Sequence, residues 1–307
     1  MNQVVDFVYF GELAALLAAF CWSIAVIIFK SASNKLSPLL ITALKNTIAL
    51  LCFIIFFIIA EIPLWYDQLN YNDYIRIVIS GALGMGFGDI LFIYALSKIG
   101  ANRIAILNCF EPAVIYFFSI IMLGTILTLQ QFIGFIIVII SILIITYEKD
   151  IEDINPITKR RGMLIHVCAI LLSSFGIVLI KPVLSKINNI IYIQLWVTAF
   201  RLLPGFIIAW IIFSFQKNKI KLLQPLKQSD ILWKIIISSG LGTFIALNFW
   251  ILGYANIEKP PVASIIGQTS AIFIIILSFI ILKEKISQLR IISILTAIAG
   301  VVLITIK

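Results

Sequence analysis

Long apolar runs recur along the whole chain and are separated mostly by short polar connectors. We place ten of them, at residues 11–33, 38–60, 74–96, 101–123, 128–147, 162–184, 190–213, 231–255, 260–282 and 288–306. Each is close to the roughly 20 residues that a helix needs to cross about 30 Å of hydrocarbon. Lipid offers the backbone no hydrogen-bond partners, so such a segment must satisfy its own peptide groups, as a helix does. The expected fold is therefore all-α, an integral membrane protein with ten transmembrane helices.

Composition argues against a soluble fold and against a separate catalytic domain. Of the 307 residues, 62% are hydrophobic and only 12% are charged, about half the charged fraction of an ordinary soluble domain. The longest connectors, at 148–161 and 216–230, are too short to fold into a catalytic domain. A functional site must therefore lie within the apolar spans.

The sequence lacks the motifs of common catalytic and metal sites. All four cysteines fall inside predicted spans, which indicates neither a disulfide framework nor a spaced metal site. H-E-x-x-H, G-x-S-x-G, C-x-x-C and the phosphate-binding P-loop are absent, so the usual signatures of hydrolases and primary pumps are missing. We expect no enzyme activity, no cofactor and no metal site.

The net charge of +9 is informative about orientation. Sixteen of the 23 Lys and Arg lie in or beside the odd-numbered connectors, and five flank the opposite side. The positive-inside rule then places the odd connectors in the cytoplasm and both termini outside. Because topology explains the basic balance, we expect the lipid bilayer and a small-molecule solute as partners, and no nucleic acid.

The chain contains an internal repeat. ISGALGMGFGDILFIYALSKIGANRIAIL, from Ile79, runs parallel to ISSGLGTFIALNFWILGYANIEKPPVASI, from Ile237, at an offset of 158 to 159 residues. Earlier matched positions are Gly11 and Gly162, Lys30 and Lys181, and Lys45 and Arg201. Five spans per copy is an odd number, so residues 151–307 must enter the membrane from the side opposite to residues 1–150. Such an inverted repeat usually frames a site near the bilayer midplane.

These features resemble the drug/metabolite transporter superfamily, specifically its ten-helix EamA-type branch, over nearly the whole chain. The resemblance rests on the duplicated five-helix unit, the small-residue third and eighth helices, YALSKIGANRIAIL and LKEKISQLRIISILTAIAGVVLIT. The chain departs from the family's Leu-Gly-Glu pattern at Thr125 in the first copy and at Leu282-Lys283-Glu284 in the second. The resemblance implies a secondary transporter of small metabolites such as amino acids. It also implies cytoplasmic termini, opposite to the orientation that the charges favour.

Four ionisable side chains lie deep within predicted spans, where each is costly and indicates function: Lys45, Asp89, Glu111 and Arg201. With a rise of 1.5 Å per residue, Asp89 and Lys45 lie roughly 11 Å, and Glu111 roughly 15 Å, from one membrane face. In the second copy, Asn248 and Gln268 replace the two acids. We expect an acidic wall from the third and fourth helices and an amide wall from the eighth and ninth, which suits an amine-bearing or zwitterionic solute.

Two interpretations of these charges stay open. Lys45 can form a buried structural pair with Asp89 or with Glu111, which would specify packing without touching the solute. The remaining acid would be neutral in the dry membrane, because burial disfavours its charged form. A carboxyl that loses its proton when the cavity hydrates suits proton coupling. Under this hypothesis, Glu111 or Asp89 is the proton-linked group.

The segment NCFEPAV adds to the interest of Glu111. Pro112 has no N–H and cannot bond to the carbonyl of Asn108, and Asn108 lies on nearly the same helix face as Glu111. We predict a kink at Pro112 that gathers a carbonyl, an amide and a carboxyl beside a cavity. The alternative is a kink that only curves the helix.

The third span is rich in glycine. Gly81, Gly84 and Gly88 project within about 60° of one another on an α-helix, whereas Gly86 falls on a different face. Small residues allow close helix approach in membranes. We predict that this helix slides or rocks on one partner while Asp89 borders the cavity; static packing is the alternative.

Several other residues have weaker signals. We interpret His166, near the start of the sixth span, as an interfacial packing residue. Lys30 and Lys181 are placed to extend toward the membrane surface, although their matched positions also suit two entrances. Aromatic residues that could line a pathway or simply pack are Trp22, Tyr94, Tyr116, Trp196, Trp210 and Trp250.

The predicted function is secondary transport of an amino acid, amine or related polar solute by alternating access. We expect proton or exchange coupling and a location in a bacterial cytoplasmic (inner) membrane, since the Ile- and Lys-rich composition is typical of AT-rich bacterial genomes. A lipid-linked sugar flippase or a channel is the alternative. A membrane-embedded enzyme is disfavoured by the missing motifs.

Overall fold

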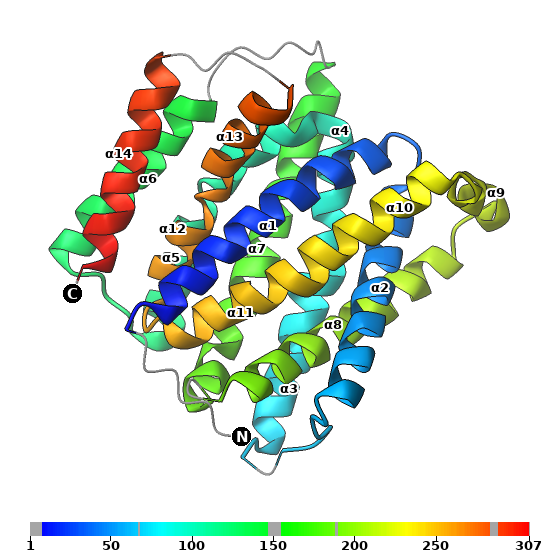
Figure 1. Cartoon of the computed structure of the whole chain (residues 1–307), viewed down its shortest axis with the longest axis horizontal. Coiled ribbons are helices and arrows are strands. Elements are labelled where there is room, and N and C mark those ends of the chain that lie inside the picture. The colour runs from blue at the N-terminus through cyan, green and yellow to red at the C-terminus, as the bar shows by residue number, and fades with distance from the viewer. Residues whose placement is uncertain (1–7, 67, 147–154, 188–189, 283–287, 307) are drawn as a thin grey trace.

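The computed structural model describes residues 8–66, 68–146, 155–187, 190–282 and 288–306, and within these ranges the fold is entirely helical (Figure 1). Its elements are α1 (Phe10–Ser33), α2 (Pro38–Ile59), α3 (Tyr71–Gly81), η1 (Ala82–Gly88), α4 (Asp89–Asn108), α5 (Glu111–Leu123), α6 (Leu129–Thr146), α7 (Pro156–Lys186), α8 (Ile191–Ser214), α9 (Lys219–Leu223), η2 (Gln224–Lys227), α10 (Ser229–Ser238), η3 (Ser239–Ala246), α11 (Leu247–Asn256), α12 (Pro260–Gly267), α13 (Ser270–Leu282) and α14 (Gln288–Thr305). The predicted boundary between the copies, at residues 150 and 151, lies outside the described residues.

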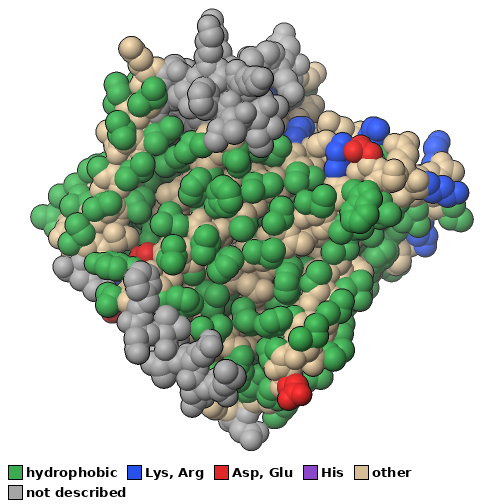
Figure 2. Space-filling model, viewed as in Figure 1, with side chains coloured by type: hydrophobic (Ala, Val, Ile, Leu, Met, Phe, Trp, Pro, Cys, Tyr) green, Lys and Arg blue, Asp and Glu red, His purple; other side chains and the backbone are tan. Residues whose placement is uncertain are grey.

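The apolar helices make the chain a multi-pass membrane protein. Six described helical stretches are long and apolar enough to cross a bilayer: Phe10–Ser33, Pro38–Ile59, Tyr71–Gly100, Pro156–Lys186, Ile191–Ser214 and Ser229–Asn256. The other four predicted spans contain the shorter apolar helices Glu111–Leu123, Leu129–Ile144, Pro260–Ile274 and Ile294–Thr305. Figure 2 shows a mainly hydrophobic face, with Lys and Arg gathered at the end near α9.

Local capping explains where several helices begin. Ser37 accepts a hydrogen bond from the backbone N–H of Leu40 at the start of α2. Asn155 does the same for Ile157 at the start of α7, and Pro156 occupies the first helical position, where its missing N–H is harmless. As a result α7 begins six residues before the predicted start at residue 162. Side chains early in the predicted span therefore lie deeper than expected.

The expected helix at 101–123 is divided. The backbone of α4 turns at Gly100, whose φ is 79°, and α4 ends at Asn108. A new helix, α5, begins at Glu111, and Pro112 lies in its first turn. The prediction that Pro112 kinks a continuous helix is therefore wrong: the proline starts a helix, a position at which it breaks no hydrogen bond. The expected helix at 260–282 is divided likewise, between α12 and α13.

Both copies contain a π-helical turn at the same place. Residues 82–88 form η1 and residues 239–246 form η3. Their hydrogen bonds run from residue i to i+5, so residues five apart share a face. An α-helical projection therefore fails here.

The glycines at the end of α3 and in η1 consequently contact two helices and not one. Gly81 and Gly86 lie against α8: a Cβ at Gly81 would overlap the carbonyl oxygen of Arg201, and one at Gly86 would lie 2.9 Å from a side-chain atom of Ile208. Gly88 lies against α7, where a Cβ would be 2.9 Å from the hydroxyl of Ser173, and a Cβ at Gly84 would lie 3.5 Å from the guanidinium of Arg201 on α8 and 3.9 Å from the backbone of Ser173 on α7. The prediction of a single smooth face at Gly81, Gly84 and Gly88, with Gly86 elsewhere, is wrong because the turn is π-helical.

The two copies exchange helices. α1 packs on α11 of the second copy, and α7 packs on α4 of the first. The closest points correspond: Gly11 lies against Ile257, and Gly162 lies against Ile99, with Ile99 and Ile257 158 positions apart. The equivalent helices α1 and α7 run in opposite directions in Figure 1. The copies are thus related by an approximate two-fold axis that reverses the chain direction.

This exchange produces two mixed bundles. Bundle I consists of α1 packed on α10, η3, α11, α12 and α13, and bundle II of α7 packed on α3, η1, α4 and α5. Near the axis, α2 pairs with α8 and α6 with α14. The α6–α14 contact is close, since a Cβ at Gly134 would lie 2.8 Å from the carbonyl oxygen of Gly300. Each bundle contains helices of both copies.

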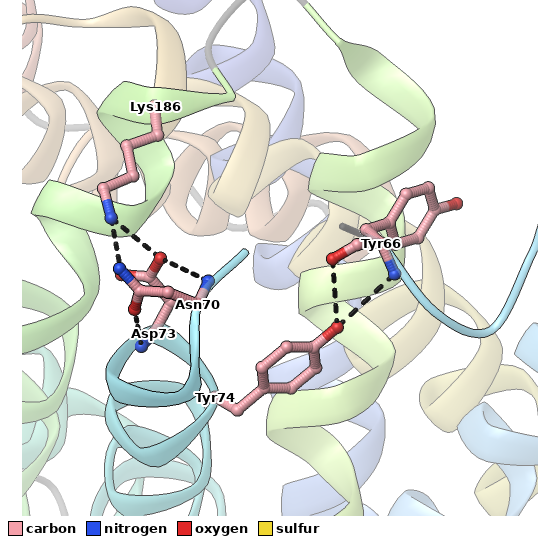
Figure 3. A network of polar contacts seen from close by, with 5 residues as sticks. All are labelled: Tyr66, Asn70, Asp73, Tyr74 and Lys186. Atoms are coloured by element: carbon pink, nitrogen blue, oxygen red, sulfur yellow. Dashed lines mark hydrogen bonds and ion pairs between the residues drawn. The ribbon is translucent and has the colours of Figure 1, made fainter. Parts of the chain in front are cut away.

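A polar network ties bundle II at one end (Figure 3). Lys186 of α7 donates to both carboxylate oxygens of Asp73, at 2.9 and 2.8 Å, and Asp73 also completes a capping box with Asn70 at the start of α3. Beside it, the Tyr74 hydroxyl forms hydrogen bonds with the backbone N–H and carbonyl of Tyr66. Tyr66 lies in the connector before α3, and burial raises the pKa of its phenol to about 12.

Bundle I has a corresponding tie. Lys35, at the end of α1, donates to the side-chain oxygen of Gln228 before α10, at 3.3 Å. Lys35 lies two residues after α1, and Lys186 is the last residue of α7. The two lysines are 151 positions apart, as are Lys30 and Lys181, so they are matched positions of the two copies. In each bundle, a lysine therefore links the end of the exchanged helix to its partner from the other copy.

We expect Gly81→Ala to destabilise the protein, because the added methyl would overlap the backbone of α8. Overpacking of this kind costs about 1–3 kcal/mol. Gly240→Ala is the matched control, since a Cβ there meets no atom within 4 Å. Thermal unfolding in detergent should show a lower melting temperature for Gly81→Ala alone. Equal melting temperatures would contradict the close contact.

Candidate functional site

A cavity of about 180 Å³ lies between the two bundles. This volume has room for on the order of ten water-sized groups. Its polar lining includes Lys45, Asp89, Asn108, Glu111, His166 and Gln268. Its aromatic lining includes Trp22, Phe92, Trp250 and Tyr254. Five of the predicted site residues therefore surround one space, and Arg201 and Asn248 do not.

Lys45 and Asp89 form an ion pair in the wall of this cavity. The Lys45 Nζ lies 2.5 Å from Asp89 Oδ2, and it also donates to the side-chain oxygen of Asn46 at 3.2 Å. The Lys45 side chain is 3% exposed and that of Asp89 is 15% exposed. Of the two pairings that the sequence leaves open, Lys45 makes the one with Asp89.

Glu111 and Gln268 meet across the cavity. The side-chain nitrogen of Gln268 donates to Glu111 Oε2 at 3.0 Å. α5 and α12 pack on each other, which brings these two side chains from different copies together. Within the described part of the chain, no Lys or Arg forms an ion pair with Glu111. Glu111 thus presents a carboxyl to the cavity without a protein cation beside it.

Asn108 and His166 form a third polar pair at the cavity. His166 Nε2 lies 2.7 Å from the side-chain oxygen of Asn108, and the residue is 1% exposed. The interpretation of His166 as interfacial is wrong, because α7 begins at Pro156 and carries the imidazole into the protein. The Asn-Pro cap before α7 is the sequence signal that could have placed it.

Arg201 is buried beside the cavity and does not line it. Its Nε donates to the hydroxyl of Ser80 at 3.0 Å, and its guanidinium lies 5.4 Å from the ring centre of Trp250. Its other two nitrogens have no hydrogen-bond partner among the described residues. Arg201 is the counterpart of Lys45, but it contacts Ser80 of α3 and an aromatic ring in place of a carboxylate.

Asn248 does not face the cavity, so the predicted amide wall is reduced to Gln268. On that helix, Leu247, Trp250 and Tyr254 line the cavity. The two π-helical turns align at an offset of 158, which makes Leu247 the counterpart of Asp89. The sequence comparison left the offset at 158 to 159 residues, and Asn248 corresponds to Asp89 only at 159. The two copies therefore carry the predicted charge difference but differ more in polarity than predicted, because Asp89 has an apolar counterpart in place of an amide.

Only two of the six aromatic candidates reach the cavity. Trp22 and Trp250 line it, whereas Trp196 is fully buried and stacks on Phe200, with ring centres 3.9 Å apart. Trp210 instead donates from its indole nitrogen to the hydroxyl of Thr47. Packing is thus the observed role of these two tryptophans.

The cavity can bind a small solute, and its charges favour a positive group. Two carboxyls and one lysine line it, and the lysine is already paired. A cationic amine could pair with Glu111 and contact the faces of the aromatic rings. In the described ranges, no group of three or more His, Cys, Asp or Glu side chains is placed to hold a metal ion.

Comparisons with known proteins agree with this architecture. The chain is similar, at 15% identity and a TM-score of 0.75, to a crystal structure described only as that of a protein, with 96% of each chain covered. That likeness concerns the fold alone. A search of curated proteins found no match. The EamA-like transporter family matches residues 9–147 and again residues 160–306. The chain therefore belongs to the EamA-like transporter family.

Proposed function

We propose that the protein is a secondary transporter that moves a small amine-bearing or zwitterionic solute by alternating access through this cavity. The observation that carries the proposal is the position of the cavity, which lies between two bundles that each contain helices of both copies. A relative movement of the two bundles would expose the same side chains to either membrane face. Inverted repeats around a central site support this mechanism.

The lining supports the choice of solute. Glu111 is a carboxyl without a neighbouring cation among the described residues, and it shares its wall with an amide from Gln268. An ammonium group would supply the missing positive charge. Lys45 could attract the carboxylate of a zwitterion, although it must then loosen its pair with Asp89. The small volume favours a solute of amino-acid size.

The structure favours Glu111 over Asp89 as the proton-linked group. Asp89 is already paired with Lys45, at 2.5 Å. Glu111 has an amide partner, so its proton and a cationic solute would compete for one carboxyl. Such competition couples proton movement in one direction to solute movement in the other.

The protein's setting is a further part of the proposal. Ten membrane crossings arise when the six long stretches, α6 and α14 each cross once. The part of α4 after Gly100 together with α5 supplies the ninth crossing, and α12 with α13 supplies the tenth. We place the chain in a bacterial cytoplasmic membrane. The basic connectors, including the Lys-rich segment around α9, would then face the cytoplasm.

We expect the purified protein in liposomes to catalyse counterflow. Vesicles preloaded with a mixture of unlabelled amino acids and amines should take up a labelled member faster than empty vesicles, because exchange needs no empty carrier to reorient. Equal, non-saturating uptake with and without preloading would indicate a channel. Chemical conversion of the solute would indicate an enzyme.

Glu111→Gln should abolish the response of transport to a proton gradient, because an amide cannot release a proton. Exchange should persist with a higher half-saturating concentration for an amine. Asp89→Asn is the comparison, since it removes a carboxyl that is already paired with Lys45. The measurement is uptake with the inside acidic or alkaline. A Glu111→Gln protein that still responds like the wild type would refute this role.

Lys45→Met should lower stability by on the order of 3 kcal/mol, because it leaves a buried carboxylate unpaired. Lys45→Met with Asp89→Asn should recover most of that loss. If the pair serves only packing, the double variant transports normally. We expect instead that it unfolds at a near-normal temperature but transports poorly.

A further inference from the structure

We propose that Lys30 and Lys181 are alternating latches, each of which bridges the two bundles at one end of the cavity and releases when that end opens. The inference rests on the proposed alternating-access function. It assigns the gating contacts, which the cavity itself does not identify.

Lys181 forms the latch that is closed in this structure. It lies on α7 of bundle II and donates to the carbonyl oxygens of Tyr254, at 2.7 Å, and Ile257, at 2.6 Å. Both acceptors lie at the end of α11 in bundle I. The last carbonyls of a helix have no partner within the helix, and the negative end of its dipole attracts a cation. Lys181 is 4% exposed, so this contact closes that end of the cavity.

Lys30 makes the equivalent contact at the other end. It lies on α1 of bundle I and its Nζ is 3.4 Å from the carbonyl oxygen of Leu96, on α4 of bundle II. Leu96 precedes the break at Gly100, so its carbonyl also belongs to a last helical turn. Leu96 and Tyr254 are 158 positions apart, the same offset as the π-helical turns. The two lysines are therefore counterparts under the approximate two-fold axis.

The two contacts are equivalent in position but not in strength. Lys181 makes two short bonds, whereas Lys30 makes one long bond and is only partly buried. A smaller cavity of about 20 Å³ shares Trp22 and Phe92 with the main one and continues to Val26, one turn before Lys30. The space between the bundles thus extends toward the Lys30 end.

These lysines differ from the lysines that tie each bundle. Lys35 and Lys186 link helices within one bundle and would move with it. Lys30 and Lys181 link one bundle to the other, so a relative movement of the bundles must stretch them. A two-fold arrangement predicts that strengthening the Lys30 contact accompanies loss of the Lys181 contact. A static helix cap would keep both contacts in every state.

The test measures from which membrane face the cavity can be reached. Ser264 lines the cavity, so Ser264→Cys in a background without the four native cysteines provides a reporter thiol. A membrane-impermeant thiosulfonate reagent is added to intact cells or to inside-out vesicles, and labelling rates are compared for the unchanged protein, Lys181→Met and Lys30→Met.

Lys181→Met should raise labelling from the Lys181 side by about tenfold or more and lower it from the Lys30 side. The factor follows from the loss of hydrogen bonds from a charged donor. Lys30→Met should have the opposite effect or leave the present bias unchanged. Lys181→Arg keeps a cationic donor and should label like the unchanged protein, which controls for misfolding.

Parallel changes in both variants, or no change in a folded Lys181→Met protein, would overturn the proposal. No solute is needed for labelling, so this result is separate from the transport assay. Counterflow without a labelling shift would refute the latches alone. A labelling shift without counterflow would support the latches and point to a different solute.

Discussion

Close contact between helices of opposite copies is the constraint on which this structure depends. Membrane helices gain little from burying apolar side chains, because lipid is as apolar as the core, so small residues and backbone approach determine their packing. Here Gly11 and Gly162 bring α1 and α7 against the other copy. Neither copy alone can form a bundle or enclose the cavity. The exchange therefore creates both the scaffold and the space between its two parts.

A nearly symmetric scaffold holds an asymmetric set of charges. Lys45 corresponds to Arg201 and Asp89 to Leu247, and the second copy places the amide of Gln268 beside Glu111, so only the first copy supplies carboxyls to the cavity. In this member of the EamA-like transporter family, both copies share the scaffold, whereas the cavity carboxyls come from one copy alone.

The sequence predicts the framework better than the details of the site. Apolar length, the repeat and the layer shared by Lys45, Asp89 and Glu111 all follow from simple geometry. The π-helical turns do not follow from it, so an α-helical projection misplaced the glycine face, and a one-residue range in the repeat offset misplaced Asn248. His166 was misplaced through a missed helix cap. Burial of Arg201 away from the cavity depends on tertiary contacts with Ser80 and Trp250, which no local pattern encodes.

The opposite threading of the two copies is tested most directly by the sidedness of matched positions. Asn34 lies directly after α1, and Ser185 lies in the last turn of the equivalent helix α7. Both residues are exposed. A single cysteine at either position, in a protein without native cysteines, can be labelled from one membrane face by an impermeant reagent. The account predicts that Asn34→Cys and Ser185→Cys react from opposite faces. Labelling of both from the same face would contradict it.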